Sequence, residues 1–306
     1  MVALLKALWK LRPRDEPEAP AARLVRRWRE KRLLGRLERD WPGGLTLHRT
    51  GDLVYVPSPL DARGRHALLH PPRAHPAALA FLRPGSVVID AGANLGEWTV
   101  PFARAVGGTG RVLAIEPAPR SAAALEMTLA VNALRHAEVI RCAVGDHEGR
   151  AGFAVPVVTS VETDTGTARI GSAVAGQEGL CVPLRTLDSL MIERGLDRLD
   201  LVKIDVEGYE RKVLDGAEAA LDRFRPVLVI ETGHETEGDR AAIHHRLDGL
   251  GYRMLGILLD HGMAEAGWDA YTAPKPPFRP SDAHNLLLVP DWPRLHGGRP
   301  VPRPEV

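Results

Sequence analysis

From Val87 onward, short apolar runs alternate with amphipathic segments of helical period. Short runs rich in β-branched residues are typical of strands buried on both faces, and the segments between them are typical of crossover helices. The predicted strands are Val87–Ala91, Arg111–Glu116, Glu138–Cys142, Leu201–Asp205, Val227–Glu231, Tyr252–Leu259 and Asn285–Val289. The predicted helices are Glu97–Ala105, Arg120–Ala133, Leu187–Glu193, Glu210–Leu221 and Ala241–Leu250. This alternation predicts an α/β fold with a doubly wound, mostly parallel sheet.

The chain before Val87 has a different pattern and predicts an extension. Its expected elements are two short helices in the first forty residues, a hairpin of Leu45–His48 and Leu53–Val56, and a short helix Pro76–Leu82. We therefore expect three parts: a basic helical and hairpin extension over residues 1–80, the main domain over 81–290, and an irregular Pro/Arg-rich tail over 291–306.

A long Thr/Gly-rich stretch interrupts the main domain between two β-like runs, Ala151–Pro156 and Leu180–Leu184. Long connections without structure of their own are usually functional lids or disordered. We expect residues 157–179 to be a mobile loop over a substrate pocket.

Charge is distributed unevenly along a chain whose net charge is only +1. The first forty residues hold twelve Lys/Arg against six Asp/Glu, so this arm could make weak contact with an anionic membrane surface. The alternative is a solvated helix that packs on the main domain. The remaining chain is mildly acidic, which argues against a nucleic-acid partner. The chain has two cysteines, no signal-peptide pattern and no membrane-length apolar run, so we expect a cytoplasmic protein.

The most informative motif is Val-Val-Ile-Asp-Ala-Gly-Ala-Asn-Leu-Gly at residues 87–96. It reads as a strand, a glycine-containing loop and the start of a helix. Gly92 would let the turn approach a ligand closely, and Gly96 would allow close packing where the helix begins. Asp90 could accept a hydrogen bond from a ligand ammonium.

A second carboxylate follows at the end of the next predicted strand. Glu116 lies twenty residues after Gly96, where an acidic side chain can bind the hydroxyls of a ribose. The loop is G-x-x-x-G, whereas dinucleotide sites have G-x-G-x-x-G to admit a pyrophosphate. This spacing favours a nucleoside ligand without phosphate over NAD.

Residues 87–116 resemble the first two motifs of class I S-adenosylmethionine-dependent methyltransferases. The run Leu201-Val-Lys-Ile-Asp-Val-Glu-Gly-Tyr-Glu210, with Thr186-Leu-Asp-Ser-Leu before it, resembles the FkbM-type family. The resemblance also includes Val213-Leu-Asp-Gly-Ala217 and Arg225-Pro-Val-Leu-Val-Ile-Glu231, and it spans roughly residues 80–235. It implies a Rossmann-like, seven-stranded sheet, S-adenosyl-L-methionine as cofactor, and methyl transfer, usually to a hydroxyl oxygen of a small molecule, sugar, glycan or natural product.

The resemblance also assigns residues to the cofactor. Carried over by position, the methionine and ribose side would be lined by Asp90, Gly92, Asn94 and Gly96. Glu116 would bind the ribose diol, and Ala143 or Asp146 would lie near adenine. Asp205 would face the reacting centre.

A hydroxyl nucleophile benefits from a base, and three residues near the ends of the central strands are candidates: Asp205, Glu207 and His234. Asp205 is the first choice, although it could instead orient the cofactor. Glu207 could simply cap the following helix, and His234 could be a bystander. Glu231 could pair with Lys203.

Metal binding is not predicted, although two groups of residues raise the question. Mg²⁺ would suit Asp205, Glu207 and Glu231 if they converged, which a sequence does not establish. His66 and His70 have the i, i+4 spacing of a metal site, but Pro71-Pro72 follows and no third ligand is evident.

Two other functions remain open from the sequence. An NAD-dependent oxidoreductase on a similar fold is disfavoured by the loop spacing and by the lack of a hydride-transfer constellation. A non-catalytic nucleoside-binding module would keep the cofactor residues alone. The sequence specifies neither the acceptor nor the oligomeric state.

Overall fold

The computed structural model describes residues 43–48, 50–58, 61–156, 169–171, 177–233, 235–259, 262–274 and 284–290, together with Arg29, Arg32 and Arg36. The predicted helices of the first forty residues, the tail beyond Pro290 and most of the Thr/Gly-rich stretch lie outside these ranges. No helix in the described ranges combines the length and apolarity that a bilayer crossing requires.

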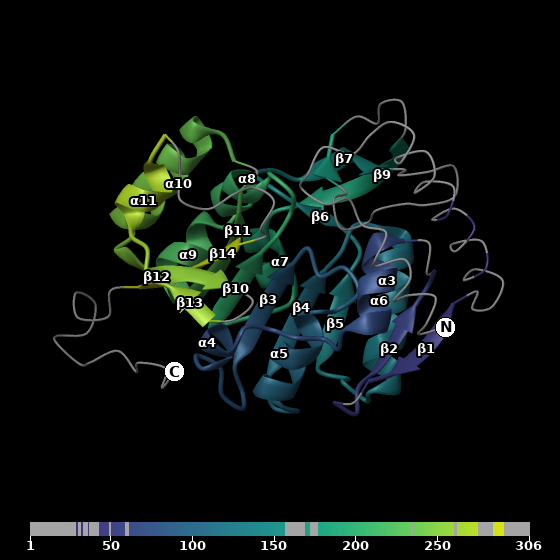
Figure 1. The fold of residues 1–306 in the computed structure, drawn as a ribbon. Coiled ribbons are helices and arrows are strands. Elements are labelled where there is room, and N and C mark those ends of the chain that lie inside the picture. The colour runs from purple at the N-terminus through teal and green to yellow at the C-terminus, as the bar shows by residue number, and fades with distance from the viewer. Residues whose placement is uncertain are drawn as a thin grey trace.

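The core of the molecule is one eight-stranded sheet with the order β13-β12-β14-β11-β10-β3-β4-β5 (Figure 1). Its strands are β3 (Val87–Ala91), β4 (Arg111–Ile115), β5 (Ala137–Ile140), β10 (Leu201–Ile204), β11 (Val227–Thr232), β12 (Tyr252–Leu259), β13 (Gly262–Ala264) and β14 (His284–Pro290). Strand β14 lies antiparallel between β11 and β12, and the five strands from β11 to β5 are parallel. The predicted doubly wound sheet is confirmed, with the short β13 as an additional edge strand.

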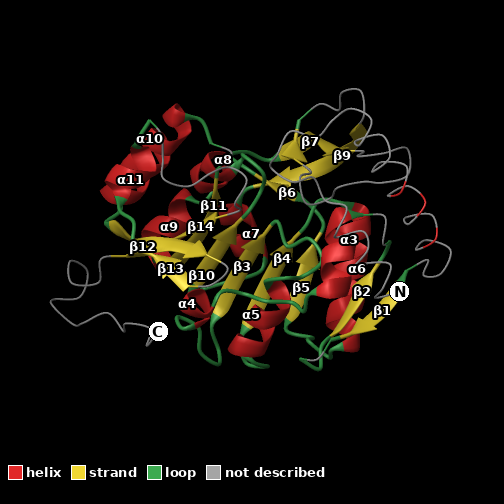
Figure 2. Cartoon of the chain, viewed as in Figure 1, coloured by secondary structure: helices red, strands yellow, loops and turns green. Residues whose placement is uncertain are grey.

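Helices cover both faces of this sheet, because alternate side chains of each strand are apolar on both sides. On one face Val88 and Val112 pack with α4 (Pro76–Leu79), α5 (Thr99–Val106) and α6 (Pro119–Val131). On the other face Ile89 and Leu113 pack with α7 (Leu187–Glu193), α8 (Glu210–Asp215), α9 (Glu218–Phe224) and α10 (Glu237–Gly249). Figure 2 shows the strands of the sheet between these helices.

Two smaller sheets flank the main one. Strands β6 (Ala143–Val144), β7 (Gly149–Pro156), β8 (Arg169–Ile170) and β9 (Gln177–Arg185) form a sheet of order β6-β9-β7-β8. The predicted N-terminal hairpin is confirmed as β1 (Gly44–Leu47) and β2 (Leu53–Val56). Backbone N–H groups of Leu53 and Tyr55 donate to Asn132 Oδ1 and Thr128 Oγ1 of α6, at 3.0 and 2.9 Å, which fixes the hairpin on the main domain.

Several predicted boundaries are wrong for local physical reasons. The single helix expected over Glu210–Leu221 is two helices, which separate at Gly216. A Cβ there would lie 1.9 Å from the carbonyl oxygen of Gly145, so the chain is pressed against a neighbouring loop. Part of the expected loop 157–179 is strand, since β8 lies within it and β9 begins at Gln177. The helices α3 (Ala62–Leu69) and α11 (Trp268–Thr272) were not predicted.

Candidate active site at the carboxyl ends of the central strands

A cleft opens beyond the carboxyl ends of β3, β4 and β10, where ligands bind in open α/β sheets. Its empty volume, which includes space open to solvent, is about 1030 Å³. The walls come from the loop after β3, the ends of β4 and β10, the small sheet, and helix α3 of the extension. Of the predicted cofactor residues, the lining includes Asp90, Gly92, Asn94, Glu116 and Ala143.

The glycine loop packs directly against the turn that follows β10. Gly92 has φ +84°, and a Cβ there would lie 1.8 Å from the carbonyl oxygen of Asp205. The backbone N–H of Asp205 donates to the carbonyl oxygen of Ala91 at 3.0 Å. Only glycine fits this approach, so the cofactor loop and the turn carrying Asp205 form one rigid unit.

Asp90 is completely buried at the end of β3. Thr99 Oγ1 donates to Asp90 Oδ2 at 2.6 Å, and Lys203 Nζ lies 3.7 Å from Asp90 Oδ1. Burial raises the pKa of the Asp90 carboxyl above its usual range, although Lys203 and Thr99 oppose that shift. Asp90 Oδ2 is therefore hydrogen-bonded, whereas Oδ1 is near the charge of Lys203 but beyond hydrogen-bond distance of it.

Glu116, just after β4, presents its carboxylate at the cleft. Its Oε1 accepts from the backbone N–H of Ala118 at 2.7 Å, and its Oε2 accepts from that of Asn94 at 2.8 Å. Each carboxylate oxygen has a second lone pair, so the group retains capacity for two hydroxyl donors. Burial raises the pKa of Glu116 to about 7 despite these amide bonds.

Two predicted cofactor residues are absent from the described lining of the cleft. Gly96 has φ +90°, and a Cβ there would lie 2.5 Å from Leu125 Cδ1, so its function is close packing of the loop on α6. Asp146 pairs with Lys212 and His147, which hold the pKa of its carboxyl low, at about 2. Its assignment to adenine remains a prediction.

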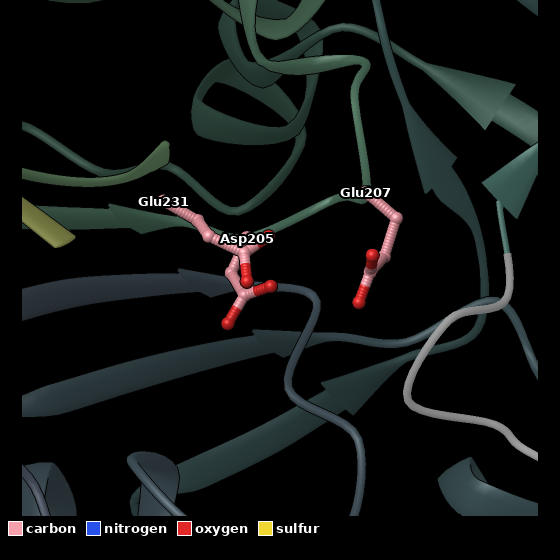
Figure 3. Close-up of side chains that lie close together, drawn as sticks. All are labelled: Asp205, Glu207 and Glu231. Atoms are coloured by element: carbon pink, nitrogen blue, oxygen red, sulfur yellow. The ribbon is translucent and has the colours of Figure 1, made fainter. Parts of the chain in front are cut away.

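Three carboxylates meet at the ends of β10 and β11. Asp205 and Glu207 follow β10, Glu231 is in β11, and one oxygen of each lies within 4.8 Å of the others (Figure 3). The adjacency that the sequence left open is therefore real. Asp205 is also hydrogen-bonded to Lys203 Nζ at 2.8 Å. Glu207 has φ +56°, a left-handed conformation that is rare for a residue with a side chain.

The three carboxylates cannot all be ionised in this environment. Burial and the charge of Asp205 raise the pKa of Glu231 far above its usual range, so Glu231 is protonated at neutral pH and hydrogen-bonds to Asp205. Burial would raise the pKa of Asp205, but the ammonium of Lys203 and the hydrogen bond with Glu231 lower it overall. The site therefore contains an ionised Asp205 between two hydrogen-bond donors.

Glu210 stabilises the turn that carries Asp205 and Glu207 by hydrogen-bonding to its backbone. Glu210 Oε1 accepts from the backbone N–H groups of Val206 and Gly208, at 3.2 and 3.0 Å. Burial raises the pKa of Glu210 to about 7. The alternative that Glu207 caps the following helix is wrong, since Tyr209 occupies that position without a side-chain cap and Glu210 binds the turn instead.

Helix α3 lines the cleft together with Phe153 and Ile170 of the small sheet. Its Arg63 and His66 contact Glu97 of the glycine loop: His66 Nε2 lies 3.0 Å from Glu97 Oε1, and Arg63 Nη1 lies 3.8 Å from Glu97 Oε2. The rings of His66 and His70 stack with centroids 4.5 Å apart. The two histidines with i, i+4 spacing therefore stack on each other, and the partner of His66 across the cleft wall is a carboxylate.

Sequence reasoning missed Arg63, Glu97 and Trp98 as cleft residues. A signal for α3 was present, since Asp61 caps it by accepting from the N–H groups of Arg63 and Gly64 at 2.9 and 3.1 Å. His234 lies outside the described residues, so its candidacy stays a prediction.

Comparison with known proteins decides the family. The family model described as the methyltransferase FkbM domain matches residues 90–254, more than half of the chain. The chain belongs to the FkbM methyltransferase family. It is an S-adenosylmethionine-dependent methyltransferase.

Similar FkbM-family proteins include two curated relatives. The 31-O-demethyl-FK506 methyltransferase FkbM of Streptomyces tacrolimicus is 32% identical over 204 residues, which is 57% of this chain and 75% of that protein. The methyltransferase sdnD of Sordaria araneosa is 29% identical over 203 residues, 57% of this chain and 76% of that protein. A crystal structure of a methyltransferase FkbM from Methylobacillus flagellatus KT aligns with a TM-score of 0.44 and 20% identity, covering 67% of this chain and 43% of that chain.

The described residues fit the cofactor of this FkbM-family enzyme. Glu116 faces the cleft and can still accept hydrogen bonds from a ribose diol. Gly92 has no side chain, so the loop can approach a ligand closely. Ala143, which the sequence predicts to lie near adenine, and the adjacent Cys142 add small apolar surface to the cleft. The loop, the acid and the apolar wall are thus present together in one cleft.

Proposed function

We propose that this protein transfers the methyl group of S-adenosylmethionine to a hydroxyl oxygen of a small molecule, a sugar or glycan, or a natural product. The observation that carries the proposal is the ionised Asp205 in the cleft, with Lys203 Nζ at 2.8 Å and a protonated Glu231 as its second partner. About 22% of its side-chain surface is accessible, so an acceptor can reach it.

The chemistry requires a positioned nucleophile more than a strong base. When bound, the cofactor supplies an electrophilic methyl group on a sulfonium. Asp205 would orient the acceptor hydroxyl for in-line attack and accept its proton at a carboxylate oxygen as the new C–O bond forms and the C–S bond breaks. Lys203 would keep Asp205 ionised before the reaction, and the proton would pass from Asp205 to solvent afterwards.

The walls of the cleft support an acceptor of moderate size. Beyond the cofactor residues, Phe153 and Ile170 of the small sheet offer apolar surface, and His66 of α3 offers a polar ring. Pockets of this composition suit a molecule with an apolar body and polar groups. The name of the relative from Streptomyces tacrolimicus refers to methylation of a 31-O-demethyl compound, which supports the same reaction class.

The direct test is product analysis with S-adenosylmethionine carrying a ¹³C-labelled methyl group. The purified protein would be incubated with panels of alcohols: hydroxylated natural products, free and lipid-linked sugars, and glycans, together with matched amines and thiols. We expect the label on an alcohol oxygen of at least one acceptor, identified by NMR and mass spectrometry. Transfer only to nitrogen, carbon or sulfur would contradict the proposal.

A further inference from the structure

Helix α3 holds its side chains in a fixed place beside the glycine loop. Asp61 caps its first turn, and Gly64 packs so closely on the preceding chain that a Cβ would lie 2.1 Å from the carbonyl oxygen of Ser58. Val56 of β2 approaches the same point, with its Cγ1 at 3.2 Å. Arg63 is in this first turn, so the backbone that carries its guanidinium is well anchored.

The charge of Arg63 faces the cleft among carboxylates. Burial would lower the pKa of its guanidinium, but the charges of Asp205, Glu97 and Glu207 raise it overall, so Arg63 stays charged. Within the described part of the chain its ion pair is with Glu97, and the 3.8 Å separation is longer than a hydrogen bond. The donors of the guanidinium therefore remain available to a ligand carboxylate.

The other cation of the cleft is already committed. Arg63 and Lys203 are the lysine and arginine residues of the described lining. Lys203 is only 2% exposed and is engaged by Asp205 at 2.8 Å and Asp90 at 3.7 Å. A carboxylate entering the cleft would thus find its cationic partner in Arg63.

Two carboxylates are candidate partners for a ligand ammonium, and they differ in how accessible they are. Asp90, which the sequence suggests for this role, is fully buried and faces Thr99 and Lys203. Glu97 keeps 40% of its side-chain surface accessible. His66 occupies one of its oxygens, which leaves further acceptor positions on both.

We propose that Arg63 and Glu97 together bind the amino-acid end of the cofactor, Arg63 through its α-carboxylate and Glu97 through its α-ammonium. The two side chains carry opposite charges on one wall of the cleft, and these charges complement the carboxylate and the ammonium of a zwitterionic amino acid. Helix α3 lies outside the residues 90–254 that match the family model, so the extension would complete the cofactor site.

Binding measurements test this proposal without any methyl acceptor, and hence independently of the proposed O-methylation. Three ligands would be titrated by calorimetry: S-adenosylhomocysteine, its decarboxylated counterpart that keeps the amine, and 5′-methylthioadenosine, which lacks both groups. All three share the nucleoside and the sulfur, so differences between them report on the amino-acid end.

For Arg63→Met we expect S-adenosylhomocysteine to bind about 10- to 100-fold more weakly, because a charge-assisted hydrogen bond is lost. The decarboxylated ligand and 5′-methylthioadenosine should bind within about twofold of the wild-type protein. For Glu97→Gln we expect about a tenfold loss for the two ligands that carry an amine, with 5′-methylthioadenosine unaffected.

The matched control is Arg73→Met, which removes an exposed arginine from the same segment outside the cleft lining and should change none of the three affinities. Arg63→Lys keeps the charge and should recover part of the loss. Retained binding of 5′-methylthioadenosine shows that the pocket is folded. The proposal is overturned if Arg63→Met binds S-adenosylhomocysteine as tightly as the wild type, or if it weakens all three ligands equally.

Discussion

The two ends of the cleft hold their carboxylates in different ways. At the cofactor end, Glu116 is bound by two backbone N–H groups and Asp90 by Thr99, so each acid has its own neutral donors. At the reacting end, Asp205 and Glu231 share one proton beside Lys203, and the state of each depends on the other. Neutral donors thus hold Glu116 and one oxygen of Asp90, whereas the reacting end is one coupled unit, to which Asp90 is connected through Lys203 at 3.7 Å.

This difference indicates what each end can do. Separate acids with fixed donors can recognise a ligand, because each contact contributes on its own. Coupled acids can respond to a proton, because a change at one is felt by the other.

The largest effect should come from breaking the coupled unit. Asp205→Asn removes the carboxylate that would accept the hydroxyl proton, so we expect kcat to fall about 100- to 10,000-fold. Binding of S-adenosylhomocysteine should change by less than about threefold, because Asp205 does not contact the cofactor's nucleoside end. Steady-state kinetics with an acceptor from the panel and calorimetry measure the two quantities.

The control for that experiment is Glu207→Gln in the same cleft. Lys203 Nζ is hydrogen-bonded to Asp205, the proposed base, so removing the charge of Glu207 should cause a clearly smaller loss of kcat. Equal losses in the two variants, or a loss of cofactor binding in Asp205→Asn that matches its loss of kcat, would refute the assignment of Asp205 as the base.

A second, intermediate effect should appear at the cofactor end as a pH dependence. With the pKa of Glu116 at about 7, lowering the pH from 8 to 6 protonates the carboxylate that would accept from the ribose diol. We expect affinity for S-adenosylhomocysteine to fall about tenfold over that range, since protonation competes with binding. In Glu116→Gln the affinity should be lower and nearly independent of pH; the same pH dependence in both proteins would exclude Glu116 as its source.

The smallest effect should concern the stability of the fold, through Glu210, which hydrogen-bonds to the turn after β10. The folded pKa of Glu210, about 7, lies above its unfolded value, so its contribution to stability is fully present below pH 4.5 and is lost as the pH rises to 7. Glu210→Gln removes this loss. Between pH 5 and 8, the free energy of unfolding of the variant should rise relative to wild type by about 1 to 3 kcal/mol, measured by urea titration. A pH-independent difference would show that Glu210 is ionised at both pH values.

Local patterns predicted the cofactor end well. Residues 87–116 form one strand–loop–helix–strand unit, and the strand Val87–Ala91 and the acid Glu116 are where the apolar runs place them. The hydrophobic pattern suffices here because the buried strands and the positions that require glycine are neighbours in sequence. The same holds for the ranges of the strands β5, β10 and β11, which the apolar runs also predict to within one or two residues.

The reacting end depends on contacts that a single sequence does not contain. Whether Glu231 approaches Asp205 depends on the pairing of β10 with β11, and its protonation depends on burial. The position of Arg63 in the cleft depends on the contact of α3 with the glycine loop, which is more than thirty residues away in sequence. The apolar pattern of that helix is too weak for it to be recognised in the sequence. The split at Gly216 likewise arises from a neighbouring loop.

The contact between Gly92 and Asp205 has a consequence for redesign. The glycine loop contacts the backbone of the turn that carries Asp205, so a change in either one would displace the other. The loop and the turn are therefore expected to change together or not at all. The wall where we expect the acceptor is built differently, with side chains of the small sheet that line the cleft. Diversity in the molecules that are methylated can therefore accumulate in that wall, at Phe153, Ile170 and their neighbours, while the methyl-transfer machinery stays intact.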